Sequence, residues 1–144
     1  MSEEFKVEVL TPARELVTTT ASEVLLPTYI GEAGSGEIGV LPHHEDICGL
    51  LSTGTLKIVT HNKDFWFMVS GGAYRVENGV LTVLAEYATG AEAIDAQATL
   101  TRLKEVDFEL SMNLNTLEDK TISLTAEKTR LSASIEANRR HSMS

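Results

Sequence analysis

Hydrophobic and polar residues alternate along the first ninety positions of the chain. Phe5, Val7 and Val9 are separated by Lys6 and Glu8, which is the two-residue period of a strand with one buried face. Further short runs rich in β-branched and aromatic residues follow, each bounded by Pro, Gly or Asn. They predict strands over residues 15–20, 24–26, 38–41, 47–51, 56–60, 65–69, 74–76 and 80–84.

Turn-forming residues separate these segments. Asn78–Gly79 lies between two β runs and predicts a type I′ hairpin turn, because that turn needs a positive φ at both central residues. Gly54 and Gly71–Gly72 are interpreted as turns in the same way, and Pro27 as the end of a strand. Many short strands without a helical period between them predict an all-β, antiparallel sandwich or barrel, and we expect the sandwich over residues 1–88.

The pattern changes after Gly90. Residues 91–144 contain neither Gly nor Pro, and apolar residues recur at steps of three and four, the stripe of an amphipathic helix. Polar residues interrupt the stripe, so it predicts helices that pack on another surface. The stripe runs through Ala96, Leu100, Leu103, Asp107, Leu110, Leu114, Leu117, Thr121, Leu124, Lys128, Leu131 and Ile135.

An Asn- and Ser-rich segment, Ser111–Thr116, favours a turn within the tail. Thr116, followed by Asp119, is typical of the N-cap of a second helix. The sequence therefore predicts a C-terminal helical hairpin. The stripe keeps its phase through the turn, so one continuous helix of about 75 Å is the open alternative.

Charge excludes several classes of partner. Residues 1–90 hold 12 acidic and 5 basic residues, a net −7 out of −9 for the chain. Such a surface argues against nucleic acid and against electrostatic binding to anionic lipid. No apolar run reaches the length of a membrane span, and the N-terminus lacks a targeting pattern, so a cytosolic protein without membrane insertion is expected.

Three local patterns suggest chemistry, and each has a structural alternative. Gly34, Gly36 and Gly39 spell a dinucleotide fingerprint, but Val40–Pro42 follows instead of a helix, which favours a flexible inter-strand loop. The neighbouring residues His43–Asp46 resemble a metal cluster, yet adjacent strand residues point to opposite faces, so no metal site is expected. Cys48, the single cysteine, lies in an apolar run and is interpreted as a small core residue.

The aromatic run Phe65–Phe67 places two phenylalanines on one face of a strand and Trp66 on the other. Trp66 is therefore either a second-layer core residue or the anchor of a partner surface. The basic residues near the end of the tail either complement the helix dipole or contact an acidic surface or a phosphate on a larger partner; they are Arg139, Arg140 and His141.

Four segments in register give a resemblance to a known family. Residues 36–44, GEIGVLPHH, resemble the GE(I/L)GVLPGH motif of the ε subunit of F-type ATP synthase. The Leu51–Leu56 turn, the VSGG segment Val69–Gly72 and the Ile94–Asp95 start of the first tail helix also match that family.

The resemblance implies a non-catalytic rotor subunit that needs no cofactor. Its sandwich binds the γ subunit and the ring of c subunits and couples ring rotation to ATP synthesis on other chains. Its helices fold on the sandwich or extend to the α/β subunits and inhibit ATP hydrolysis. Such a subunit is peripheral, on the cytoplasmic face of the bacterial inner membrane.

The resemblance also implies roles for individual residues. Trp66 is the candidate contact with γ. The c-ring contact is carried by Glu37, Ile38, Gly39, His43 and His44. The regulatory contacts of the tail are carried by Leu117, Leu124, Leu131, Arg139 and Arg140.

The sequence departs from the family at three places. The loop that precedes the first motif, Tyr29–Ser35, is longer than usual by a few residues. His43 replaces the usual Gly of the first motif, and Glu45–Asp46 replace Ala-Pro. Some members bind ATP through an I/L-D-x-x-R-A motif, in which Ala98 here occupies the Arg position. Because a guanidinium is the fitting bidentate phosphate donor, we expect ATP binding to be weak or absent. A β-sandwich adaptor and a nucleotide-dependent enzyme are the alternative functions.

Overall fold

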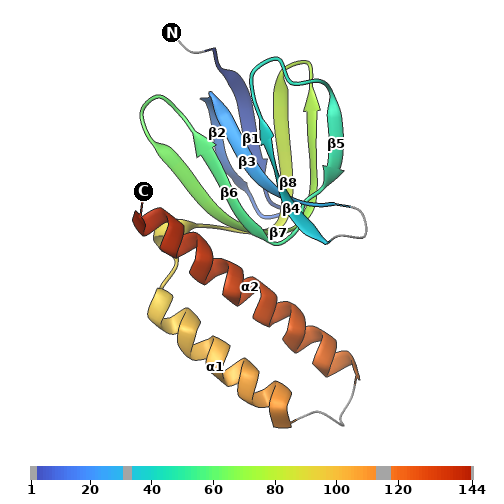
Figure 1. The fold of residues 1–144 in the computed structure, drawn as a ribbon, viewed down its shortest axis with the longest axis vertical. Coiled ribbons are helices and arrows are strands. Elements are labelled where there is room, and N and C mark those ends of the chain that lie inside the picture. Colours follow the sequence, from blue (N-terminus) through green and yellow to red (C-terminus); the bar gives the residue numbers. More distant parts are fainter. Residues whose placement is uncertain (1–2, 31–33, 113–117, 144) are drawn as a thin grey trace.

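The computed structural model describes residues 3–30, 34–112 and 118–143 as a β-sandwich followed by two helices (Figure 1). The strands are β1 (Phe5–Leu10), β2 (Glu15–Ala21), β3 (Glu23–Tyr29), β4 (Ser35–Val40), β5 (Ile47–Leu50), β6 (Gly54–Val59), β7 (Asp64–Glu77) and β8 (Val80–Gly90). One 3₁₀ turn, η2 (Ala91–Ala93), leads to helices α1 (Ala96–Met112) and α2 (Glu118–Met143). The predicted order, an all-β sandwich and then a helical hairpin, is confirmed.

The eight strands form one hydrogen-bonded sheet that folds over into two layers. Its order is β2-β1-β8-β7-β6-β3-β4, and β5 pairs with the second half of β7. Strands β1 and β8 run parallel, whereas the other pairs among the described strands are antiparallel. The expectation of a purely antiparallel sandwich is therefore wrong at β1–β8.

Alternation along the strands places the core between the two layers. In β1 the side chains of Phe5, Val7 and Val9 are buried, while Lys6 between them is exposed. The predicted hairpin turn at Asn78–Gly79 joins β7 to β8, with φ of 52° and 76° at its two residues. The two-residue period and the turn chemistry thus agree in specifying this body.

The prediction of a turn at Gly71–Gly72 is wrong. The chain does not reverse there, because β7 continues from Asp64 to Glu77 and its pairing with β8 keeps one register on both sides. The two glycines have φ of 73° and 114°, and they lie where the partner of β7 changes from β6 to β5. Positive φ here bends a continuous strand from one layer into the other.

Pro27 does not end its strand either. β3 continues to Tyr29, and the carbonyl oxygen of Pro27 accepts a hydrogen bond from the backbone N–H of Ser52. A residue's N–H and C=O point to the same side of a strand, so the missing donor faces away from β4. On that side the β3–β6 ladder has already ended at Leu25. The proline therefore removes no ladder hydrogen bond.

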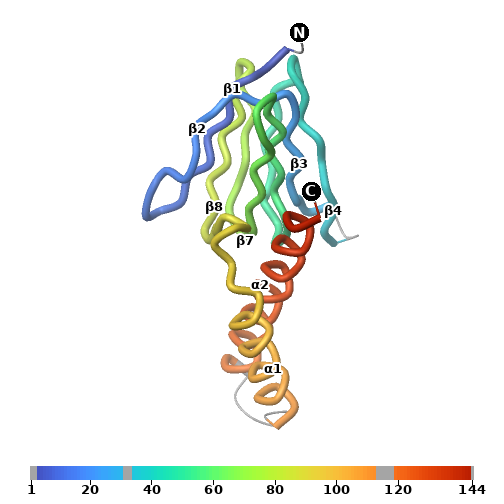
Figure 2. Tube along the Cα trace, turned by 90° about the vertical axis from the view of Figure 1, so that its left-hand side faces the viewer, coloured from blue at the N-terminus to red at the C-terminus, as the bar shows by residue number. Residues whose placement is uncertain are grey.

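The two helices form an antiparallel hairpin that projects from the end of the sandwich opposite the N-terminus (Figure 2). α2 packs on β6 and β7, and α1 packs on α2. The hairpin, rather than one long helix, is the arrangement present. The predicted cap at Thr116 and the stripe residues Leu114 and Leu117 lie outside the described residues.

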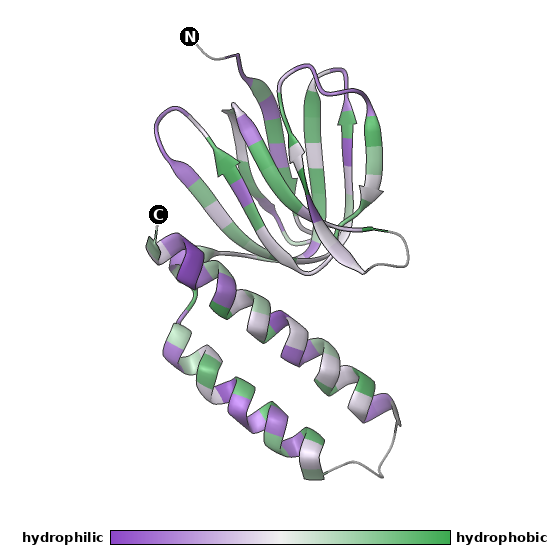
Figure 3. Ribbon diagram, in the orientation of Figure 1, coloured by the Kyte–Doolittle hydropathy of each residue, from purple (hydrophilic) through white to green (hydrophobic). Residues whose placement is uncertain are grey.

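The helical stripe is partly different from the prediction. The fully buried residue of α1 is Val106, whereas the neighbouring Asp107 is exposed. Asp107 Oδ1 instead lies 2.8 Å from Nζ of Lys128 on α2, so two polar interruptions of the stripe pair with each other. Figure 3 accordingly shows hydrophilic and hydrophobic segments mixed along both helices.

Candidate functional site

Trp66 lies where the tail meets the sandwich. Its ring and Met68 point away from the main core, and both contact the tail through a small apolar cluster with Ala91 and Ala137. Phe67 faces the main core, and Phe65 packs against that core, as the alternation predicted. Trp66 is 6% exposed, so the partner that covers it in this structure is the chain's own α2.

Two cations flank the Trp66 ring. Lys57 Nζ lies 4.7 Å and the Arg140 guanidinium carbon 5.2 Å from the ring centroid, which is the range of cation–π attraction. The indole Nε1 is buried without a hydrogen-bond acceptor among the described residues. An unpaired buried donor costs free energy, so the same ring both holds the tail and weakens its attachment.

The predicted ring-contact residues of β4 are divided between two faces. Glu37 and Gly39 are exposed, whereas Ile38 is half-buried and packs against the core. Glu37 Oε2 lies 3.8 Å from Nη1 of Arg140, so this carboxylate faces the last turns of the tail. The strand therefore presents Glu37 and Gly39, but not Ile38, on one accessible surface.

His43 and His44 lie in the turn that follows β4, beyond the end of the strand that is farther from Glu37. His43 Nε2 is 2.6 Å from Oε2 of Glu3, and His44 Nδ1 is 2.7 Å from the carbonyl oxygen of Glu45. His43 has φ of 66°, in the left-handed region, which explains why the related motif has Gly at this position. The structure does not bring these histidines together with Glu37.

An apolar surface that sequence reasoning missed lies on the outer side of β5, β7 and β8. Leu50 and Leu84 are 64% and 52% exposed beside Ala73, and they line a cavity of about 540 Å³. Cys48, expected in the core, is exposed and lines the same cavity, so that prediction is wrong. The signal that could have found it is the adjacent pair Leu50–Leu51, which places an apolar side chain on each face of the chain.

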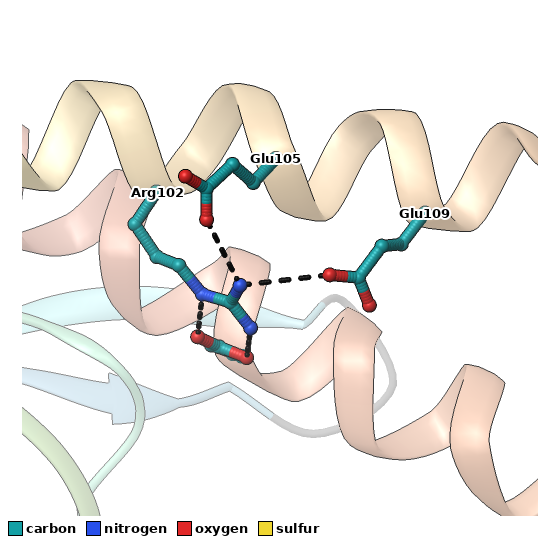
Figure 4. A network of polar contacts seen from close by, with 4 residues as sticks. Arg102, Glu105 and Glu109 are labelled. Carbon is teal, nitrogen blue, oxygen red and sulfur yellow. Dashed lines mark hydrogen bonds and ion pairs between the residues drawn. The ribbon is translucent and has the colours of Figure 1, made fainter.

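Arg102 of α1 joins the two helices (Figure 4). Its Nε and Nη2 donate to the two carboxylate oxygens of Glu127 on α2, at 2.6 and 3.0 Å. Nη1 also lies 3.2 Å from Glu105 Oε2 and 3.6 Å from Glu109 Oε1. The hydrogen bonds with Arg102 lower the pKa of Glu127. No local sequence pattern predicts this contact, because Arg102 and Glu127 are 25 residues apart in the chain.

The predicted regulatory residues of the tail have different surroundings. Leu124 is buried and Leu131 half-buried, while Leu117 lies outside the described residues. Arg139 pairs with Glu136 on its own helix at 2.6 Å, and this hydrogen bonding lowers the pKa of Glu136. Arg140, one residue further, instead reaches the sandwich.

The two motifs that suggested nucleotide binding have other structural roles. Gly36 and Gly39 belong to β4 and do not open a helix, so the interpretation as an inter-strand loop is also wrong for them. At the start of α1, Asp95 Oδ1 accepts a hydrogen bond from the backbone N–H of Ala98, which is the geometry of a helix N-cap. The Ala98 side chain itself is exposed.

Among the described residues, no helix has the length and apolar character needed to cross a membrane.

Comparison with known proteins places this architecture. Residues 4–91 match the family described as "ATP synthase, Delta/Epsilon chain, beta-sandwich domain". An ATP synthase epsilon chain of Solibacter usitatus is 34% identical over 130 residues, which cover 88% of this chain and 93% of that protein. A chloroplastic ATP synthase epsilon chain of Pelargonium hortorum is 41% identical over 91 residues, 62% of this chain and 63% of that protein.

A solved structure shares the fold over nearly the whole chain. A chain of the mitochondrial ATP synthase of Euglena gracilis, from a structure of its OSCP, F1 and c-ring, superposes with a TM-score of 0.76. The superposition covers 98% of this chain and 82% of that chain at 19% identity, so it supports the fold alone. Together with the sequence matches, it accounts for both the sandwich and the helices. The chain therefore belongs to the family of ATP synthase epsilon chains.

Proposed function

We propose that this chain is a non-catalytic subunit of the central stalk of a rotary, proton-translocating ATP synthase. In this role it couples rotation of the c-ring to ATP synthesis on other subunits, and its C-terminal helices restrain ATP hydrolysis. The observation that carries the proposal is the match to an epsilon chain over 88% of the sequence, which includes sandwich and tail together. The protein would then be peripheral, on the cytoplasmic face of the bacterial inner membrane.

The exposed apolar surface around Leu50 and Leu84 is the proposed contact with γ. Both leucine side chains are exposed over half of their area, and their burial against a partner lowers the free energy of the complex. We expect Leu84→Glu to abolish co-purification with γ while the circular dichroism of the chain stays unchanged. Thr20→Glu, at an exposed polar position on β2 that does not line this cavity, is the matched control for added charge and should still bind γ. Equal binding of γ by both variants and the wild type would exclude this surface.

Trp66 stays a prediction for γ contact in a different state. It becomes accessible when α2 leaves β6 and β7, since α2 covers it in the folded state. The c-ring contact is proposed for the exposed residues of β4, Glu37 and Gly39, with His43 and His44 in the turn that follows this strand. In the extended state of the tail, Arg139 and Arg140 are the proposed contacts with α/β.

Truncation after Gly90 tests the restraint on hydrolysis. The deletion removes η2, α1 and α2 and leaves every strand of the sandwich. We expect the complex to assemble and its ATPase activity to rise. If ATPase activity is unchanged under all nucleotide conditions, the tail is not an inhibitor.

Ala98 tests the expected lack of ATP binding by the chain alone. Isothermal titration with ATP should give no measurable heat of binding, because no guanidinium occupies this position. The double variant Ala98→Arg, Thr99→Ala restores the motif on an exposed part of α1 and should gain binding. Tight binding of ATP by the unmodified chain would refute the expectation.

A further inference from the structure

The proposed c-ring contact on β4 and the end of the helical tail meet at one ion pair. Arg140 Nη1 lies 3.8 Å from Oε2 of Glu37, and the two side chains are 31% and 43% exposed. The same guanidinium lies 5.2 Å from the centroid of the Trp66 ring. Arg140 therefore connects the covered face of β7 with the accessible face of β4.

The surroundings make this link electrostatic rather than apolar. α2 packs directly on β6 and β7, but between α2 and β4 lies a cavity of about 430 Å³. Its lining includes Glu37, Glu136 and Arg140 together with Ser and Thr side chains. Across this cavity α2 reaches β4 through the long side chain of Arg140, and such a contact can break while the strand stays in place.

Glu37 has one carboxylate. A cationic or amide group of another subunit that binds this carboxylate must either displace Arg140 or share the carboxylate with Arg140. We propose that the tail and the c-ring compete for Glu37, so that ring binding loosens the hold of the sandwich on the tail. This inference rests on the proposed ring contact of Glu37. By thermodynamic linkage, a docked tail weakens ring binding by the same factor.

The size of the competition follows from the exposure of the pair. Ion pairs between partly exposed side chains change equilibria by roughly 1.5- to 5-fold. Arg140 keeps its contact with the Trp66 ring when Glu37 is taken, so the tail is loosened and not expelled. The effect is thus a modest bias on the tail, applied from the ring side of the molecule.

Trp66 supplies a direct readout, because it is the single tryptophan of the chain and lies beneath Arg140. The full-length chain, labelled with 5-fluorotryptophan, is titrated with purified detergent-solubilised c-ring and followed by fluorine NMR. We expect ring binding to shift the Trp66 resonance. We also expect Arg140→Gln to bind the ring about 1.5- to 5-fold more tightly than the wild type.

Arg139→Gln is the matched control, since Arg139 carries the same charge one residue away but pairs with Glu136 on its own helix. It should leave ring affinity and the Trp66 resonance as in the wild type. Ring binding without a change at Trp66, and with equal affinity for Arg140→Gln, would overturn the competition and leave the proposed function intact. No binding of the ring by the wild type would refute the ring contact itself, and the competition with it.

Discussion

The sandwich and the tail differ in what holds them together. In the described part of the chain, the main core of the sandwich contains 17 buried apolar residues, whereas α1 and α2 together bury Val106, Leu124 and Ala137. The helices are joined instead by exposed or half-exposed ion pairs, of which Arg102–Glu127 has the shortest N···O distance, 2.6 Å. Added salt does not weaken the stabilisation that comes from buried apolar area, whereas it screens the attraction between exposed charges.

The two parts are therefore expected to respond to different conditions. A dense core makes the sandwich one cooperative unit, and the loss of a few ion pairs leaves it intact. Among the residues that the structure describes, the tail has few buried contacts, and the indole N–H of Trp66 at its docking site has no acceptor, so the tail belongs to the least stable part of the molecule. We therefore expect the tail to leave the sandwich well before the sandwich unfolds.

The largest effect is expected at the bend of β7. A Cβ at Gly72 would overlap the carbonyl oxygen of Leu84, and the backbone there has φ of 114°. Gly72→Ala should lower the free energy of unfolding of the sandwich by about 3 kcal/mol or more. Gly79→Ala isolates the cost of φ alone, since φ is 76° and no atom lies within 4 Å of its Cβ. If urea denaturation finds the same loss of unfolding free energy for both variants, overlap with the Leu84 carbonyl is not the cause of the Gly72→Ala effect.

A pair of Leu→Ala substitutions compares the two regions directly. Leu56 is fully buried in the sandwich, so Leu56→Ala should cost about 2–5 kcal/mol and shift the main unfolding transition. Leu124 is buried in the tail, so Leu124→Ala should raise amide exchange in α1 and α2 and leave the main transition in place. A shift of the main transition by Leu124→Ala would show that tail and sandwich unfold as one unit.

Arg102 should have a smaller effect, confined to the hairpin. Arg102→Ala removes the two-point contact with Glu127, and we expect faster amide exchange in both helices with an unchanged sandwich. Arg102→Lys keeps the charge without the planar pair of donors, so its amide exchange rates should lie between those of the wild type and Arg102→Ala. Added salt should bring wild-type exchange toward that of Arg102→Ala. Salt-independent exchange would argue against an ionic contribution.

The smallest effect is expected from pH. The pKa of Glu127 is lowered from 4.5 by its hydrogen bonds with Arg102, so the folded hairpin binds this proton less readily than the unfolded chain. Its contribution is present above pH 4.5 and is lost as pH falls through the lower folded pKa. The helical NMR signals of α1 and α2 should weaken in that window. Glu127→Gln should reduce this pH dependence, and an identical profile would contradict the assignment.

Sequence reasoning predicted the body well where one pattern determines one outcome. Alternation at Phe5, Val7 and Val9 and the turn at Asn78–Gly79 both have the expected structure. Gly71–Gly72 shows the limit, because a glycine pair signals positive φ but does not say whether the chain reverses. Pro27 is similar, since its effect depends on which side of the strand lacks a partner.

The candidate site was harder to predict because its contacts join distant parts of the chain. The pairing of Arg102 with Glu127 depends on the relative register of two helices, which the stripe alone does not determine. Cys48 was misplaced because both faces of β5 carry apolar side chains, and periodicity cannot choose between a core and a partner surface. Trp66 was correctly placed opposite Phe65 and Phe67, but the tail that covers it was not foreseen.

Native-state hydrogen exchange of the full-length chain tests the central claim, that the tail opens separately from the sandwich. Val83, in the core of β8, and Val106, in α1, are both fully buried, so burial alone predicts similar protection. We expect the amide of Val83 to exchange only through global unfolding, with a strong dependence on denaturant. The amide of Val106 should exchange orders of magnitude faster, with little dependence on denaturant. Equal rates with equal denaturant dependence at both amides would contradict this claim.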